Sequence, residues 1–255
     1  MITIGLDIGS VAAKGVLLKG EQLYSKMIPT GWSPRNAGEQ LINHLLQHTG
    51  YGSHDVDNII VTGYGRVSVH DASRTITEIK CHARGVVELY PQIRTIIDIG
   101  GQDSKVIQVD SRGRVVDFAM NDKCAAGTGR FLQVMANTLG MDVSELADSE
   151  NQEQAVAINS MCTVFAESEI IGMLAQGIDK GSIIAGLHRS IGKRVAAMVK
   201  RLGVNKEVAF TGGVAMNRGV QRALEEELGC KVLVPEICQF TGALGAALLG
   251  RENVA

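Results

Sequence analysis

A five-residue motif occurs twice in this chain, and this repeat restricts the fold more than any other feature of the sequence. Residues 6–10 read LDIGS and residues 97–101 read IDIGG, and a lysine follows each aspartate after seven positions, at Lys14 and Lys105. In both copies an apolar strand precedes the glycine turn and two apolar strands follow it. Shared spacing and shared strand order indicate that the chain contains two copies of one structural unit.

Strands alternate with helices through the rest of the chain. Apolar runs predict strands at residues 2–19 (two strands), 23–28, 59–62, 95–97, 106–109, 115–119, 208–210 and 232–234. Helical periodicity predicts helices at residues 37–49, 78–90, 128–139, 163–176, 183–202, 218–228 and 242–249. We expect the acidic segment 142–154 to be solvated. The pattern predicts an α/β fold of two related lobes, residues 1–94 and 95–255, with a cleft between them and a last helix able to pack back on the first lobe.

Composition excludes several classes of protein. The 255 residues carry a formal net charge of −2, which argues against nucleic acid as the main partner. The longest uncharged run, residues 237–250, is shorter than the roughly 18 residues that a membrane span needs. The N-terminal residues lack the pattern of a signal peptide, and five cysteines, an odd number, suggest reduced thiols. We therefore expect a cytoplasmic protein.

The two glycine turns are typical of sites that hold phosphate, because glycine lets backbone N–H groups approach an oxyanion closely. Asp7 and Asp98 end their strands at these turns, where carboxylates suit Mg²⁺ held mostly through water and can orient an attacking water. The alternative is that each aspartate only caps its turn, and that Lys14 is an exposed strand lysine. The other candidate residues of the two turns are Gly9, Ser10, Lys14, Gly100, Gly101, Gln102 and Asp103.

A third glycine turn follows the strand at residues 208–210. Thr211, Gly212 and Gly213 stand between that strand and a helix, where the backbone can approach the sugar or base of a nucleotide, and Asn217 lies just beyond. Gly127 and Thr128 occupy a similar place before the helix at residues 128–139, and we include them among the nucleotide-binding candidates.

These motifs carry a family resemblance. GLDIGS with its lysine, DIGGQD and TGGVAMN occur in the order of the two phosphate motifs and the adenosine motif of the acetate and sugar kinase, Hsp70 and actin superfamily, whose ribonuclease H-like lobes enclose a nucleotide cleft. The segments KCAAGTGRF and MCTVFAESEI resemble the activator ATPases of 2-hydroxyacyl-CoA dehydratases, a group that includes ATPase subunits of benzoyl-CoA reductase. The resemblance covers nearly the whole chain, and the two cysteine segments are its specific part.

The resemblance implies a homodimer that holds one [4Fe–4S] cluster between its subunits through Cys124 and Cys162. It further implies ATP and Mg²⁺ as cofactors, ferredoxin or flavodoxin as electron donor, and an iron–sulfur dehydratase or reductase as electron acceptor. The activity implied is ATP-driven transfer of single low-potential electrons.

The residues themselves also favour a thiolate site. Cys124 and Cys162 each precede a predicted helix, and the free N–H groups of a helix N-terminus stabilise thiolate. No CxxC pair occurs, so one chain offers two ligands and a four-thiolate cluster needs a second copy. The alternatives are core thiols and a Cys₄ zinc site. Cys81, Cys230 and Cys238 are interpreted as core or surface thiols. The rival function is a small-molecule kinase on the same scaffold.

Overall fold

The computed structural model describes residues 1–160, 162–203, 205 and 207–252, which form two compact units. Unit 1 comprises Met1–Ile96, Ile107–Asp117 and Pro235–Ala255, and unit 2 comprises Ile97–Val106 and Phe118–Val234. Each unit is therefore assembled from segments that are separate in sequence. The division into lobes at residues 94 and 95 remains a prediction about the repeat.

The first sheet has the strand order β3-β2-β1-β4-β5. Its strands are β1 (Ile2–Ile8), β2 (Ala12–Lys19), β3 (Gln22–Pro29), β4 (Asn58–Thr62) and the two-residue β5 (Arg74–Thr75), which periodicity did not predict. Strands β1, β2 and β3 are antiparallel neighbours, whereas β1, β4 and β5 run parallel. The register places Asp7 directly opposite Lys14.

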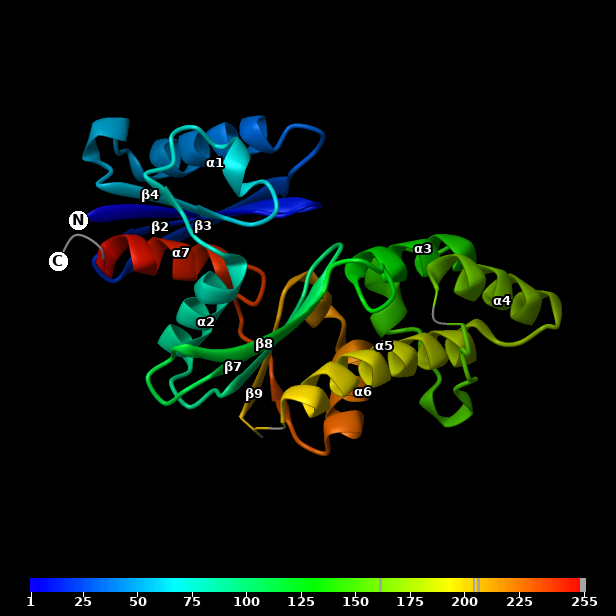
Figure 1. The fold of residues 1–255 in the computed structure, drawn as a ribbon. Helices are drawn as coiled ribbons and strands as arrows, with labels where there is room; N and C mark the ends of the chain where they lie inside the picture. Colours follow the sequence, from blue (N-terminus) through cyan, green and yellow to red (C-terminus); the bar gives the residue numbers. More distant parts are fainter. Residues whose placement is uncertain (161, 204, 206, 253–255) are drawn as a thin grey trace. The chain divides into compact units, whose positions relative to one another are not determined.

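Helices cover both faces of this sheet (Figure 1). On one face Ile4, Leu6 and Ile8 form a buried cluster with residues of α1 (Pro34–Thr49). Helix α1 begins three residues before its predicted start because the Ser33 side chain accepts a hydrogen bond from the backbone of Asn36 and proline occupies the first turn.

The other face of β1 carries α7 (Thr241–Glu252), and α7 packs in turn on α2 (Glu78–Leu89). These elements meet backbone to backbone. A β-carbon on Gly5 would overlap the carbonyl of Ala243, and one on Gly245 would overlap the carbonyl of Cys81. Glycine is therefore required where β1, α7 and α2 meet, and this contact fixes the position of Asp7 near the end of β1.

The second sheet has the order β10-β9-β6-β7-β8. Its strands are β6 (Thr95–Ile99), β7 (Ser104–Val109), β8 (Val115–Asn121), β9 (Val208–Thr211) and β10 (Val232–Leu233), and its helices are α3 (Gly129–Leu139), α4 (Thr163–Ala175), α5 (Lys180–Leu202) and α6 (Arg218–Leu228). The strand order of the first sheet thus recurs, and the predicted α/β class is confirmed. Short 3₁₀ turns lie at Ser53–Asp55, Arg66–Ser68, Val143–Ala147, Gln152–Gln154 and Gly213–Met216.

The acidic segment 142–154 is not solvated throughout, contrary to expectation. Leu146 is buried, and the Glu150 carboxylate is only 7% exposed. Glu150 pairs with His188 Nδ1 of α5 at 2.6 Å and with the guanidinium of Arg222 of α6. Burial alone raises the pKa of Glu150, but the hydrogen bonds from His188 and Arg222 outweigh it and lower the pKa to about 2.

This lowered pKa makes a prediction about acid stability. The glutamate pKa is 4.5 in the unfolded chain, so the carboxylate stabilises the fold above that pH, and the contribution is lost as the pH falls toward 2. Glu150→Gln should therefore have a lower free energy of unfolding at neutral pH. The deficit relative to the wild type should narrow below pH 4.5. Urea titrations between neutral pH and pH values below 4.5 measure the free energy of unfolding of both proteins. Glu226→Gln, on the exposed side of α6, is the control. A deficit that is constant with pH would contradict the assignment.

Candidate functional site

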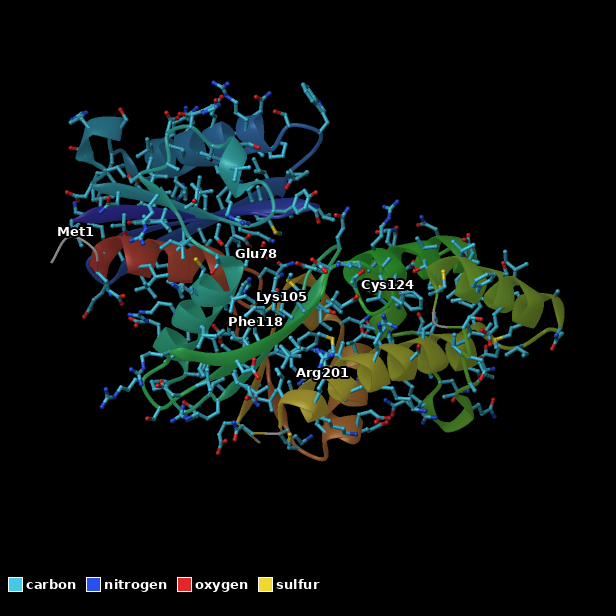
Figure 2. All side chains as sticks on the ribbon, viewed as in Figure 1. Met1, Glu78, Lys105, Phe118, Cys124 and Arg201 are labelled. Atoms are coloured by element: carbon cyan, nitrogen blue, oxygen red, sulfur yellow. The ribbon has the colours of Figure 1, made fainter. Side chains whose placement is uncertain are left out.

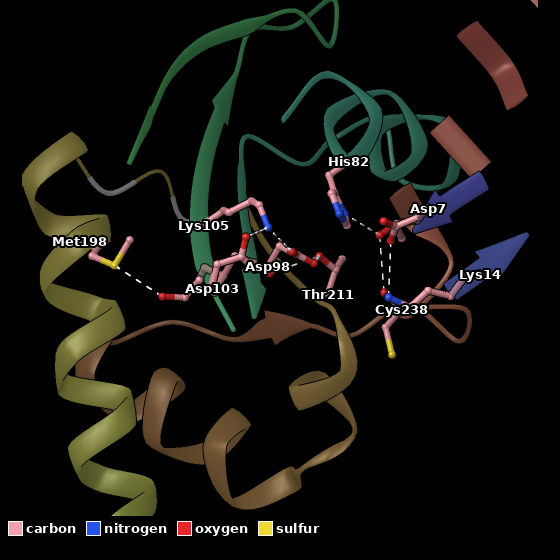
Figure 3. A network of polar contacts seen from close by, with 12 residues as sticks. Asp7, Lys14, His82, Asp98, Asp103, Lys105, Met198, Thr211 and Cys238 are labelled. Atoms are coloured by element: carbon pink, nitrogen blue, oxygen red, sulfur yellow. Dashed lines mark hydrogen bonds and ion pairs between the residues drawn. The ribbon is translucent and has the colours of Figure 1, made fainter. Parts of the chain in front are cut away.

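The turn after β1 in unit 1 contains a buried ion pair. Asp7 is 5% exposed, and its Oδ2 lies 3.5 Å from Nζ of Lys14, whose side chain is 17% exposed (Figure 3). The hydroxyl of Thr30 donates to the carbonyl of Gly9 at 2.6 Å and fixes the turn. Gly9 and Ser10 are half-buried. A largely buried lysine paired with a strand-end aspartate differs from the exposed strand lysine considered as the alternative.

A histidine that the sequence did not single out lies beside Asp7. His82 of α2 is 5% exposed, and its Nδ1 is 3.1 Å from the hydroxyl of Thr241 (Figure 3). A β-carbon on Gly242 would lie 3.0 Å from His82 Nε2 and 3.2 Å from Asp7 Oδ2. The imidazole and the carboxylate therefore flank the same point, and a side chain at Gly242 would require one of them to shift by a few tenths of an ångström.

The equivalent turn in unit 2 is more strongly paired. Nζ of Lys105 lies 2.7 Å from Asp103 and 3.5 Å from Asp98, and the lysine is 2% exposed (Figure 3). The hydroxyl of Thr211 donates to Asp98 Oδ1 at 2.9 Å. Asp98 is thus held by one cation and one hydroxyl, whereas Gln102 is exposed. Lys105 therefore belongs to this site. The sequence signal for it was its position seven residues after Asp98, which matches the spacing of Lys14 from Asp7.

The turn at Gly100 and Gly101 is tied to the start of α3. The carbonyl of Gly100 accepts from the N–H of Gly129 at 2.9 Å, and that of Gly101 accepts from Arg130 at 2.7 Å. Thr128 is fully buried, and its hydroxyl donates to the carbonyl of Ala125 within the preceding loop. The second phosphate-type turn, the predicted residues Gly127 and Thr128, and helix α3 therefore form one connected piece.

A second repeated feature appears in the structure. Gly212 after β9 has φ of +88°, and a β-carbon there would overlap the carbonyl of Ile99. Gly63 after β4 has φ of +92°, and its β-carbon would overlap the carbonyl of Ile8. Both glycines follow a buried threonine, so the pair of Thr-Gly steps was a readable signal of the duplication. Positive φ at close backbone approach requires glycine in each unit.

The remaining nucleotide candidates lie at the start of α6. Gly213 is exposed, whereas Asn217 is 7% exposed and caps α6 by accepting from the N–H of Val220. The Asn217 side-chain nitrogen is buried and has no hydrogen-bond partner among the described residues. Since a buried donor without a partner is costly, this nitrogen fits a ligand oxygen.

The two predicted cluster cysteines have accessible thiols in different settings. Cys162 is exposed and is the N-cap residue of α4. Cys124 is half-buried in the loop before α3, and its carbonyl accepts from Nδ2 of Asn121 at 2.8 Å. Both thiols are free of disulfides. Within the described parts of the chain no group of three or more Cys, His, Asp or Glu side chains forms a metal site. Two accessible thiols per chain fit a cluster that two copies would share.

The other cysteines are unsuited to that role. Cys81 and Cys238 are buried, and Cys230 is half-buried. Burial raises the pKa of the Cys81 thiol to about 12, so it remains protonated at neutral pH. In addition, no helix within the described residues is long and apolar enough to cross a membrane.

Comparisons with known proteins agree with these features. A family model described as the BadF/BadG/BcrA/BcrD ATPase family matches residues 4–250. The chain is 50% identical to a 2-hydroxyisocaproyl-CoA dehydratase activator of Clostridioides difficile, over 97% of this chain and 94% of the relative. It is 45% identical to the (R)-2-hydroxyglutaryl-CoA dehydratase activating ATPase of Acidaminococcus fermentans, over 99% and 98%. It is 32% identical to a benzoyl-CoA reductase component of Thauera aromatica, over 98% and 93%.

Solved structures give the same result. The 2-hydroxyisocaproyl-CoA dehydratase activator with bound ADPNP superposes with a TM-score of 0.94 at 50% identity, over 99% of this chain and 95% of the other. Component A of the A. fermentans (R)-2-hydroxyglutaryl-CoA dehydratase superposes with a TM-score of 0.95 at 44% identity, over 100% of both chains. A Streptomyces griseus ROK family glucokinase, at 14% identity and a TM-score of 0.59, shares the fold alone, over 99% of this chain and 100% of the other. The predicted fold, with its actin/Hsp70-like lobes, is confirmed.

The crowding at Gly242 makes a prediction. In Gly242→Ala the added methyl would lie 3.2 Å or less from Asp7 Oδ2 and His82 Nε2, so one of them must move. We expect the affinity for Mg·ADP to fall by about tenfold, or about 1.4 kcal/mol, with the fold retained. Isothermal titration calorimetry measures this. Gly172→Ala in α4 is the control, since a β-carbon there has no atom within 4 Å. Unchanged Mg·ADP affinity in Gly242→Ala would contradict a role for this corner.

Proposed function

The chain belongs to the BadF/BadG/BcrA/BcrD ATPase family, and on this premise we propose that it uses ATP to pass single low-potential electrons to a 2-hydroxyacyl-CoA dehydratase. One observation carries the proposal. The carbonyls of Gly100 and Gly101 are bonded to the first N–H groups of α3, and the loop that carries Cys124 leads directly into that helix. We therefore expect a change at the nucleotide turn to displace the start of α3 and the cysteine loop together.

The names of the relatives support the choice of partner. Three relatives at 44–50% identity are described as activators or activating ATPases of 2-hydroxyisocaproyl-, (R)-2-hydroxyglutaryl- and lactoyl-CoA dehydratases. They share an acyl-CoA dehydratase as the protein acted upon, and we transfer that class to this chain. The likeness to the benzoyl-CoA reductase component keeps an iron–sulfur reductase as the alternative acceptor. The glucokinase shares the fold alone, so it does not favour a kinase.

We assign the nucleotide chemistry to the paired turns. Asp7 and Asp98 would hold Mg²⁺ mostly through water, and Lys14 and Lys105 would balance phosphate charge. Asp98, which is already oriented by Thr211 and Lys105, would orient the attacking water together with the neighbouring residues Gln102 and Asp103. The residues that would hold the rest of the nucleotide are Gly9, Ser10, Gly100, Gly101, Gly127, Thr128, Thr211, Gly212, Gly213 and Asn217.

We assign the electron carrier to Cys124 and Cys162. Each chain supplies two accessible thiols, so a homodimer would hold one [4Fe–4S] cluster, which when bound accepts and releases one electron. Next to Cys162 the side chains of Val164 and Phe165 are 66% and 68% exposed, and a second copy would cover such apolar surface. Reduced ferredoxin or flavodoxin would be the donor, and the cytoplasm would be the compartment.

The first prediction of this proposal concerns hydrolysis. Asp98→Asn removes the charge that orients water and metal but keeps the hydrogen bond from Thr211. We expect ATP hydrolysis to fall by about a hundredfold or more, roughly 3 kcal/mol of transition-state stabilisation, while the fold is retained. Phosphate release assays measure it, and Asp71→Asn at an exposed loop position is the control. Wild-type turnover in Asp98→Asn would remove this carboxylate from any catalytic role.

The second prediction concerns iron. Anaerobically purified wild type should contain about four iron atoms per dimer, with a broad visible band that dithionite bleaches. Cys124→Ala and Cys162→Ala should each lose the cluster, because either change removes two symmetric ligands. Cys230→Ala, at a half-buried thiol elsewhere in unit 2, is the matched control and should retain it. Four irons in a monomer, or an intact cluster in Cys162→Ala, would refute the shared site.

A further inference from the structure

Unit 2 contains a cavity of about 540 Å³ between α5 and the end of β8. It has an apolar floor and a basic rim. From β8 and α3 come Met120 and Phe131, and from α5 come Met198 and three cationic side chains. We call this cavity and the neighbouring outer face of β8 the α5–β8 groove.

The groove exists because α5 does not cover the edge strand of its sheet. Alternation along β8 places Phe118 and Met120 on one face, and these side chains are 51% and 43% exposed. On the corresponding edge strand of unit 1, Tyr24 and Ile28 pack against the cluster that includes α1. The two repeats therefore differ here, and the second leaves an apolar strand face open. Figure 2 marks Phe118 on β8 and Arg201 on α5.

The groove and the Asp98 carboxylate lie on different faces of the second sheet, although the nucleotide candidate Gly127 also lines the groove. On β7, the hydroxyl of Ser104 contacts the sulfur of Met198 of α5, whereas the next residue, Lys105, bonds Asp98 and Asp103. Adjacent strand residues point to opposite faces. Met198 lines the groove, so the groove and the Asp98 carboxylate lie on opposite faces of the second sheet.

The rim carries positive charge without compensation. Lys193, Arg194 and Arg201 follow one face of α5, and none of them makes a hydrogen bond or ion pair with another residue in the described part of the chain. The described lining residues include no carboxylate. Three cations without side-chain partners among the described residues, beside the exposed side chains of Phe118 and Met120, complement an acidic surface with an apolar centre, which is the arrangement of many protein interfaces.

The wall of the groove is the loop of Cys124. Asn121, Ala126 and Gly127 all line it, and the Asn121 amide donates to the carbonyls of both Cys124 and Ala126. A partner seated in the groove therefore touches the residues on both sides of the cysteine.

We propose that the α5–β8 groove docks the acidic face of the small one-electron donor protein. The inference rests on the proposed function, since it identifies where the electron enters. The donor is oxidised by one electron and the activator is reduced by one, and no bond forms or breaks. The cations steer the acidic donor to the groove, where Met120 and the neighbouring Phe118 provide the apolar contact.

The test compares charge-reversed variants in electron uptake. Lys193→Glu/Arg201→Glu should reduce the second-order rate constant for reduction of the holo-dimer by an acidic two-cluster ferredoxin at least about tenfold at low salt, and should weaken its salt dependence. Reduction by dithionite should remain as in the wild type. Lys26→Glu/Lys80→Glu, with the same change in charge on exposed positions of unit 1, should behave as the wild type. An equal decrease of the rate constant for reduction by ferredoxin in both double variants would overturn the proposal.

Binding gives a readout that does not depend on turnover. Calorimetry with oxidised ferredoxin should show a Kd raised about tenfold in Lys193→Glu/Arg201→Glu and in Phe118→Ser, but not in the control pair. If Lys193→Glu/Arg201→Glu binds ferredoxin normally but delivers electrons poorly to the dehydratase, the groove belongs to the acceptor. If it binds ferredoxin normally but no longer forms a dimer, the groove belongs to a second copy. Either result would overturn the donor assignment. If the wild type contains no iron, the proposed function is wrong. The calorimetric measurement of ferredoxin binding still tests the docking proposal in that case.

Discussion

A buried aspartate that faces a lysine across a hairpin is the interaction on which both halves of this structure depend. Asp7 pairs with Lys14 in the register of β1 and β2, and Asp98 meets Lys105 across the second hairpin. Removing the lysine of such a pair would leave a buried carboxylate without its cation, at a cost of about 3–5 kcal/mol, whereas Lys105 keeps Asp103 as a partner when Asp98 loses its charge. The seven-residue spacing is thus a geometric requirement, because a shift of one residue would turn the lysine to the opposite face of its strand.

The two halves share these turns and differ in what surrounds them. Thr-Gly steps with positive φ support both turns, and the strand order is the same in both sheets. Outside the turns, unit 1 is closed by α1 and by the glycine contacts of α2 and α7, whereas unit 2 carries the accessible cysteines and the open α5–β8 groove. The turns that we assign to the nucleotide are thus alike in both units. The surface that is open to a partner protein is found in unit 2.

Local signals in the sequence predicted the strands other than β5, most helix bounds and the positions of the turns. Lys105 was visible as part of the repeat, but its burial and its bond to Asp103 depend on the folded turn. The place of His82 beside Asp7 depends on two helices that meet through Gly245, about 160 residues apart, so no local pattern contains it. The apolar run at residues 115–119 predicted the strand β8, but not that α5 leaves one of its faces open. Contacts between distant segments are therefore the part that sequence reasoning missed.

The packing of α7 on β1 also has a consequence for synthesis. The side chain of Arg251 donates to the carbonyl of Gly20 over a separation of 231 residues, and Gly5 rests on the α7 backbone. On the ribosome, β1 is synthesised long before α7 (residues 241–252). One face of the first sheet therefore stays uncovered until α7 has been made. Residues 118–234 of unit 2 are contiguous and are available earlier. We therefore expect unit 2 to complete its fold before unit 1, and the uncovered first sheet to be the segment that a chaperone would need to protect.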